Sequence, residues 1–291
     1  RRAGRIASRS SSPSGMIDAT IAKVAQTINF AMGDQGLGTT VTLDGNATSG
    51  LGLEVPPDGD PTPTMFNVLH PEKHRRMPLN DVIQGTDFGV DVAPSREALD
   101  ELDKGLGPGG QMRLRREVET LPAYDFIVID CPGSHTRLSQ VAHSLADTLI
   151  TPLNDSFIDF DLLARTDAMG DKITGPSVYS EMVWNARQLR AQAGLSAIDW
   201  IVVRNRLGAQ RMVNKEKMER AINNLSKRIG FRTAPGFNER VIFRELFPRG
   251  LTLLDLKDIG VKQLNISNIA ARQELRELIK ALNLPGVTAN F

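Results

Sequence analysis

Residues 124–133, with the sequence YDFIVIDCPG, decide the fold of this chain. The run is almost continuously apolar and β-branched, and it ends in Asp130 followed by a turn. A strand with one face in water alternates between apolar and polar residues, whereas a strand buried on both faces of a parallel sheet is apolar throughout. The run therefore predicts a central parallel strand with Asp130 at its carboxyl end.

Other segments repeat this form or show helical periodicity, and the two kinds alternate along the chain. Strands are expected at 39–44 (TTVTLD), 88–94 (FGVDVAP), 147–154 (DTLITPLN) and 200–207 (WIVVRNRL). Helices are expected at 16–33, 95–104, 111–121, 136–145, 157–168, 180–193, 211–228 and 267–283. Strands that alternate with helices form βαβ units. The predicted fold class is α/β, with a doubly wound, mostly parallel sheet flanked by helices.

Composition sets the class of protein. The 291 residues include 41% apolar and 24% charged residues, which is typical of a globular domain. Lys and Arg number 35 and Asp and Glu number 34, so an argument for nucleic-acid binding must rest on local clusters. The only cysteine, Cys131, excludes a disulfide framework. No apolar run approaches the roughly 20 residues that span a bilayer. These features predict a cytoplasmic protein without membrane attachment.

The chain shows one change of composition along its length. Residues 1–15 (RRAGRIASRSSSPSG) are basic and rich in Ser, without hydrophobic periodicity, and a loose N-terminus is expected there. Residues 46–63 are rich in Gly and Pro and predict a loop. Since no internal repeat or linker follows, residues 16–291 are expected to form a single domain.

Polar residues end three of the predicted strands. They are Asp44, Asp130 and Asn205. In an open parallel sheet, ligands bind at the carboxyl ends of the strands, and an Asp at such an end can reach a nucleotide-bound Mg²⁺, directly or through water. The alternative is that each residue only caps the turn that follows its strand.

Several segments resemble the ParA/MinD family of P-loop ATPases. IDCPGSHTRLSQVAHSLADTLITPLNDSFIDFDLLA (129–164), IDWIVVRNRL (198–207) and ERVIFRELFPRGLTLLDL (239–256) are similar to its MipZ-type members, and the similarity runs from about residue 121 to 291. DGNATSGLGLEVPP (44–57) instead resembles the ParA proteins that partition chromosomes.

This resemblance implies a deviant Walker A ATPase that forms a homodimer around ATP and Mg²⁺. MipZ-type members bind DNA nonspecifically, interact with the centromere-binding protein ParB and inhibit polymerisation of FtsZ. They thereby set the division plane, and they associate with the nucleoid or the cell pole. By position, Asp130 would bind Mg²⁺, Asp44 would orient the attacking water, and Asn205 would contact the adenine edge.

The phosphate loop departs from the family pattern, which is KGGxGK followed by Ser or Thr. The equivalent stretch, residues 10–20, reads SSSPSGMIDAT. If Gly15 is the last loop glycine, Met16 replaces the lysine and Ile17 replaces the hydroxyl residue. Charge-assisted hydrogen bonds contribute about 1.5–3 kcal/mol each, so the loss of two lysines weakens phosphate binding by several powers of ten. Whether this chain hydrolyses ATP is therefore left open by the sequence.

A basic segment extends from Trp184 to Arg232, with 11 Lys or Arg and three acidic residues. Arg187 and Arg190 are expected on one helix face, and Arg211 and Lys215 share another by their i, i+4 spacing. Such a face would bind DNA phosphates without reading sequence. The alternative is an ordinary solvated helix face.

The residues leave three hypotheses open. The first is an ATP-switched regulator of division, and the second is a pseudo-ATPase that keeps its binding surfaces without hydrolysis. A ParA-type partitioning ATPase is a variant of the first. The third is that the residues before Asp44 come from a shifted reading frame. His135 and His143 are expected to be ordinary histidines, and the last helix is expected to pack on the core.

Overall fold

The structure is a computed structural model of the whole chain. It describes residues 4–9, 38–43, 48–49, 51, 53–86, 90–96, 98–121, 124–132, 135–154, 160–166, 173–207, 212–246, 251–256, 260–261 and 264–287. Only the backbone is described for residues 4–9, 98, 100, 166, 173, 212–217 and 244.

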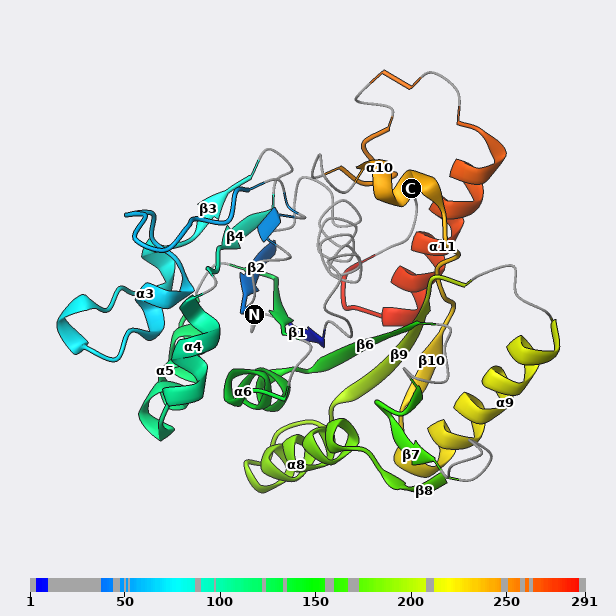
Figure 1. Cartoon of the computed structure of the whole chain (residues 1–291), viewed down its shortest axis with the longest axis horizontal. Helices are drawn as coiled ribbons and strands as arrows, with labels where there is room; N and C mark the ends of the chain where they lie inside the picture. The colour runs from blue at the N-terminus through cyan, green and yellow to red at the C-terminus, as the bar shows by residue number, and fades with distance from the viewer. Residues whose placement is uncertain are drawn as a thin grey trace.

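An eight-stranded sheet with the order β10-β9-β6-β1-β5-β2-β4-β3 organises the described residues (Figure 1). All neighbouring strands pair in parallel except β3 and β4 at one edge. The strands are β1 (Gly4–Arg9), β2 (Gly38–Thr42), β3 (Gln84–Gly85), β4 (Asp91–Ala93), β5 (Phe126–Cys131), β6 (Thr148–Asn154), β9 (Asp199–Asn205) and β10 (Arg232–Ala234). The predicted fold class is confirmed.

The first strand corrects the expectation of a loose N-terminus. Residues 4–9 form β1, which lies between β5 and β6 near the centre of the sheet. Ile6 is the register partner of Val128 on one side and of Thr148 on the other. Strand pairing with two apolar neighbours supplies the order that the basic, Ser-rich sequence does not signal by itself.

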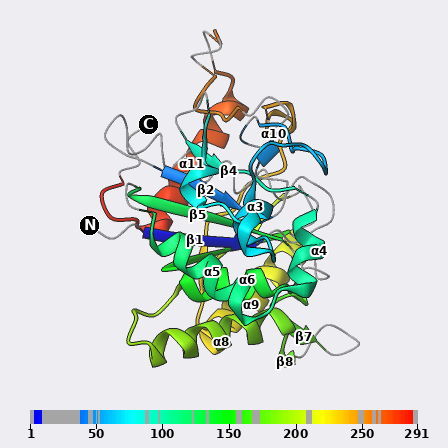
Figure 2. The ribbon, with the colours of Figure 1, turned by 90° about the vertical axis from the view of Figure 1, so that its left-hand side faces the viewer.

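Helices cover both faces of the sheet (Figures 1 and 2). On one face lie α4 (Ala98–Gly105), α5 (Pro108–Glu119), α6 (Arg137–Leu145), α8 (Val178–Gln192) and α9 (Met212–Ile229), while α10 (Val241–Leu246) and α11 (Ile266–Leu282) lie on the other. Alternate residues of β5 face the two layers. Ile127 and Ile129 belong to the first core, and Phe126 belongs to the second. Burial on both faces explains why this strand is apolar throughout.

Most predicted elements are confirmed with shifted ends. The predicted strands correspond to β2, β4, β5, β6 and β9, and six of the predicted helices correspond to α4, α5, α6, α8, α9 and α11. The predicted helix at 16–33 lies outside the described residues. The prediction of a helix over 157–168 is wrong at its end, where β7 (Ala164–Thr166) pairs antiparallel with β8 (Ile173–Pro176).

Short elements went unpredicted, namely α3 (Met65–Leu69), the 3₁₀ turns Lys73–Arg75 and Leu79–Asp81, β3, β8, β10 and α10. The last helix packs as expected, because Leu275, Leu278, Ile279 and Leu282 are buried in the second core. Within the described ranges, no helix is both long and apolar enough to cross a bilayer.

Candidate functional site

Asp130 lies fully buried at the carboxyl end of β5, between the ends of two neighbouring strands. In the sheet register its Cα pairs with Ser8 of β1 and with Thr42 of β2. Its carbonyl accepts a hydrogen bond of 2.9 Å from the amide of Leu43, so the chain that leaves β2 stays attached to β5. A buried carboxylate at this edge of a parallel sheet has the position and the ligand type of a Mg²⁺ site.

The segment after β2 is anchored by hydroxyl groups. The Thr42 hydroxyl donates to the Ala93 carbonyl at 3.0 Å and lies 3.0 Å from the Thr48 hydroxyl. The amide of Ser95 donates to Thr48 Oγ1 at 3.3 Å. These contacts join the ends of β2 and β4. Asp44, the residue expected to orient water, lies outside the described residues, between the anchored Leu43 and Thr48.

A buried arginine fixes the loop beside this edge, and the sequence carried no signal of it. Arg96 is 7% exposed and donates to the carbonyls of Asp60 and Thr62 and to the Thr64 hydroxyl, at 2.6–3.2 Å. Its guanidinium also lies 6.0 Å from the ring centre of Phe66. We read Arg96 as a scaffold residue, since its donors are directed to the protein's own carbonyls.

Two asparagines lie side by side at the ends of β6 and β9. Asn205 is buried, and its Cα pairs in register with Asn154. Within the described part of the chain, the buried Oδ1 of Asn154 has no hydrogen-bond partner. An unsatisfied buried acceptor next to Asn205 is a feature of a site that binds a polar ligand. Sequence reasoning missed Asn154, although its place at a strand end follows the same rule as Asp130.

The helix that follows Asp130 is capped from two directions. Thr136 Oγ1 accepts the amide of Ser139 at 3.1 Å. The buried carboxylate of Asp103, on α4, accepts the amides of Arg137 at 3.1 Å and Leu138 at 2.8 Å. Three amides of the first turn of α6 are thus satisfied. This capping fixes where the chain lies after it leaves the Asp130 strand.

The expected phosphate loop follows β1 directly, although Gly15, Met16 and Ile17 lie outside the described residues. In nucleotide-binding α/β folds, phosphates bind at the turn that follows a central strand. The Asp130 carboxylate at this edge is an oxygen ligand of the type that Mg²⁺ prefers. The side chains of Met16 and Ile17 offer neither a positive charge nor a hydroxyl, so any phosphate contact there must come from the backbone.

The structure corrects the proposed DNA-binding role of Arg190. Arg190 lies on α8 and is 2% exposed. Its guanidinium donates to the carbonyls of Leu145 and Ser196 and to Asp147 Oδ1, at 2.8–3.0 Å. A side chain enclosed in this way has no face to offer to a nucleic acid.

Arg187 is also occupied by the protein itself. It donates to the carbonyls of Ile229 and Gly230 at the end of α9, and it stacks 5.3 Å from the ring centre of Trp200. Burial lowers the pKa of its guanidinium. Arg187 and Arg190 therefore share a helix face, as predicted, but that face is turned to the protein.

The other predicted DNA contacts lie in or near α9. Arg211 and the side chain of Lys215 fall outside what the structure describes. Arg220, Lys227 and Arg228 are exposed on the same helix. Met218, Ile222 and Leu225 attach the opposite side of α9 to the first core.

The histidines differ in their surroundings. His135 is exposed, whereas His143 is completely buried on α6. Its Nδ1 lies 2.6 Å from the Ser139 carbonyl, and its Nε2 lies 3.4 Å from the Tyr179 hydroxyl. His143 is therefore a core residue in a hydrogen-bond network, as expected.

Comparison with known proteins identifies relatives for both halves of the chain. The family model described as ATPase MipZ matches residues 108–286, more than half of the chain, and a model described as AAA domain matches residues 21–163. The sporulation initiation inhibitor protein Soj of Bacillus subtilis is 30% identical over 42% of this chain and 47% of its own length. The chromosome partitioning protein ParA of Caulobacter vibrioides is 26% identical over 64% of this chain and 77% of its own. The chain thus spans about half of Soj and three quarters of this ParA.

A solved structure shows the same fold over nearly the whole chain. The ATP complex of a Cyanothece McdA variant superimposes with a TM-score of 0.62 at 16% identity, covering 94% of this chain and 96% of McdA. At this identity the match shows the fold alone. The family match over residues 108–286 shows that this chain belongs to the family of the ATPase MipZ.

Proposed function

We propose that this protein is a MipZ-type regulator of cell division whose surfaces are switched by ATP. The observation that supports it best is the alignment of β1, β5 and β2, which brings Asp130 beside the point where the expected phosphate loop begins. In this proposal Asp130 holds Mg²⁺, the backbone near Gly15 holds phosphate, and Asn205, with Asn154, meets the base. Asp44 orients the attacking water.

The proposed partners follow from family membership. ATP binding favours a homodimer. This dimer binds a ParB-like protein and FtsZ, and it binds DNA without sequence specificity. The protein works in the bacterial cytoplasm at the nucleoid or the pole. Lys215 of α9, together with Arg211 just before that helix, supplies the DNA contacts, since Arg187 and Arg190 are engaged within the protein.

A second candidate function has a specific observation in its favour. If Gly15 is the last glycine of the phosphate loop, as the family resemblance implies, Met16 and Ile17 stand where the family has its lysine and its hydroxyl residue. A pseudo-ATPase would keep the partner and DNA surfaces but would not respond to ATP. A ParA-type partitioning role is a variant of the first proposal, favoured by residues 44–57 and by the similarity to Soj and ParA.

Calorimetry with Mg²⁺ and ATP separates these candidates. We would compare the natural chain, a chain whose residues 10–18 carry the family loop, and an Asp130→Asn variant of each. The switch proposal expects micromolar binding by the natural chain, weakened at least tenfold by Asp130→Asn when Mg²⁺ is present. Without Mg²⁺, Asp130→Asn should change the affinity little.

Binding by the repaired chain alone would identify a pseudo-ATPase. Equal binding by the natural chain and its Asp130→Asn variant in Mg²⁺ would contradict the role given to Asp130. Thermal denaturation of each variant serves as the folding control, because Asp130 is buried.

A further inference from the structure

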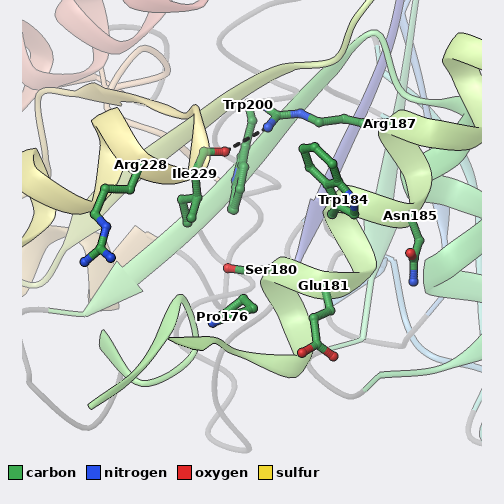
Figure 3. A pocket seen from close by; sticks show the side chains of 9 residues that line it. All are labelled: Pro176, Ser180, Glu181, Trp184, Asn185, Arg187, Trp200, Arg228 and Ile229. Carbon is green, nitrogen blue, oxygen red and sulfur yellow. Dashed lines mark hydrogen bonds between the residues drawn. The ribbon is translucent and has the colours of Figure 1, made fainter. Parts of the chain in front are cut away.

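A groove lies on the α8 and α9 side of the sheet, away from the carboxyl edge. Its volume is about 500 Å³. The residues that line it are Pro176, Ser180, Glu181, Trp184, Asn185, Arg187, Trp200, Arg228 and Ile229 (Figure 3). Trp200 is the second residue of β9 and Asn205 is its last, so a strand length of roughly 16 Å separates the groove from the candidate nucleotide site.

The inner wall of the groove is rigid. Trp200 is 2% exposed and donates from Nε1 to the Thr151 hydroxyl at 3.0 Å. The Arg187 guanidinium stacks on its ring and binds the carbonyls of Ile229 and Gly230, so α8, β9 and the end of α9 are held together. Figure 3 shows Arg187 reaching across to Ile229 beside Trp200. A preformed wall reduces the ordering cost that a ligand must overcome.

The outer wall carries an exposed aromatic side chain. Trp184 is 59% exposed on α8, one turn from Arg187. Exposed tryptophans are among the residues that most often contribute strongly to protein interfaces, because a single ring buries a large area. A concave site of 300–1,000 Å³ between two aromatic residues suits an inserted side chain better than a flat contact. The groove therefore fits an apolar or aromatic anchor.

The charges at the two ends of the groove differ. Glu181 is at one end, and its carboxylate already pairs with Arg165 at 3.7 Å. Arg228 is at the other end, exposed in the last turn of α9 beside the exposed Lys227. Within the described residues, Arg228 forms no ion pair. An occupant with a carboxylate next to its apolar anchor would complement this end.

We propose that the groove docks a short segment of a partner protein, in which a large apolar or aromatic side chain is followed by acidic residues. The apolar side chain inserts between Trp184 and Trp200, and a carboxylate pairs with Arg228. The proposal does not depend on nucleotide binding, because the groove is built from α8, β8, β9 and α9 alone.

The two tryptophans make the test direct, since the chain contains no others. Random 12-residue peptides displayed on phage would be selected on the full chain without nucleotide, and against a Trp184→Ala chain in parallel. The selected peptides, made without Trp, would then be titrated while the protein's tryptophan fluorescence is followed. We expect enrichment of sequences that join Phe, Tyr or Leu to Asp or Glu, and a saturable change in fluorescence.

Charge variants distinguish the groove from general electrostatics. Arg228→Glu should weaken the selected peptide at least tenfold, whereas Arg220→Glu, two turns earlier on α9 and outside the groove lining, should leave its affinity within twofold. Trp184→Phe should bind with an affinity close to that of the natural chain, and Trp184→Ala should bind at least tenfold more weakly. Thermal melting of each variant confirms that it is folded.

Several outcomes would overturn the proposal. One is equal peptide enrichment on the natural and Trp184→Ala chains, and another is equal weakening by Arg228→Glu and Arg220→Glu. If fluorescence changes with protein concentration alone while sedimentation shows a dimer, a second copy occupies the groove. If double-stranded DNA produces the change and Arg228→Glu abolishes it, the groove belongs to a nucleic-acid surface.

Discussion

Replacement of Arg190 by Met tests whether this arginine supports the fold or contacts DNA. Methionine keeps much of the apolar stem but removes the guanidinium. The hydrogen bonds to the carbonyls of Leu145 and Ser196 and to the Asp147 carboxylate are then lost. All of these bonds connect α8 to segments that lead into β6 and β9, so their loss should loosen the first core.

The magnitude follows from the burial of the two charges. Breaking a fully buried ion pair by removing one partner costs about 3–5 kcal/mol. The Arg190 side chain is 1% exposed, but that of Asp147 is 36% exposed and can be hydrated after the change. We therefore expect the lower end, about 3 kcal/mol. This is a large fraction of the 5–15 kcal/mol that stabilises a typical domain.

Urea denaturation followed by circular dichroism and tryptophan fluorescence measures this loss. With a denaturant dependence of about 3 kcal/mol per molar, the midpoint should fall by about 1 M. The urea midpoint of Arg190→Lys should lie between those of the natural chain and Arg190→Met, because an ammonium keeps the charge but cannot reach all three acceptors. An Asp147→Asn variant, alone and combined with Arg190→Met, measures the coupling between the pair.

DNA titration supplies the discriminating result. Under conditions where the Arg190→Met chain stays folded, its affinity for nonspecific DNA should equal that of the natural chain. The double variant Arg211→Ala and Lys215→Ala should weaken binding and flatten its salt dependence, since each lost phosphate contact lowers the slope by about 0.9. An unchanged urea midpoint for Arg190→Met, together with lost DNA binding, would refute the structural role of Arg190.

Three further changes test other contacts. Asp103→Ala should destabilise the chain by about 1–3 kcal/mol because two amides of α6 lose their acceptor, and Asp103→Asn should cost less; urea midpoints check both. Tyr179→Phe should cost about 1–2 kcal/mol in the same assay, because the Thr151 hydroxyl, 2.7 Å away, loses a buried partner. Burial and the hydrogen bond to Asp91 raise the pKa of Tyr124 to about 12. The folded chain thus holds this proton more firmly than the unfolded chain, so the stability that Tyr124 adds over Tyr124→Phe is full below about pH 10 and is lost as the pH rises toward 12. Thermal melting at pH 8.5 and 10.5 should show a smaller difference at the higher pH.

The central strands were predictable because their sequences report burial directly. Residues of β5 face apolar layers on both sides, and few structures other than a buried parallel strand require such a run. The rule that strand ends carry ligand residues also selected Asp130 and Asn205 as candidate site residues. Both are buried at the carboxyl edge. Asn154 follows the same rule and could have been found with it.

Other features depend on partners that are distant in the sequence. In β1 only Ile6 and Ala7 are apolar, and the strand is specified by the pairing edges of β5 and β6. The burial of Arg190 was equally hidden, because i, i+3 spacing tells which residues share a face but not what covers that face. Its acceptors lie in the segments that precede β6 and β9.

The position of β1 bears on what weak phosphate contacts would change in this chain. Among the described residues, the sheet is held by β5 and β6 on either side of β1 and by two apolar layers. These contacts join parts of the protein to one another, so they do not depend on how tightly a nucleotide binds. A ligand shifts a conformational equilibrium only as far as its affinities for the two states differ. Weak phosphate contacts would thus abolish the ATP-dependent conformational change while the protein stays folded. DNA or peptide binding that is strong without ATP and unchanged by it would show that ATP does not switch the protein. Binding that rises with ATP would show that backbone amides near Gly15 supply enough differential affinity.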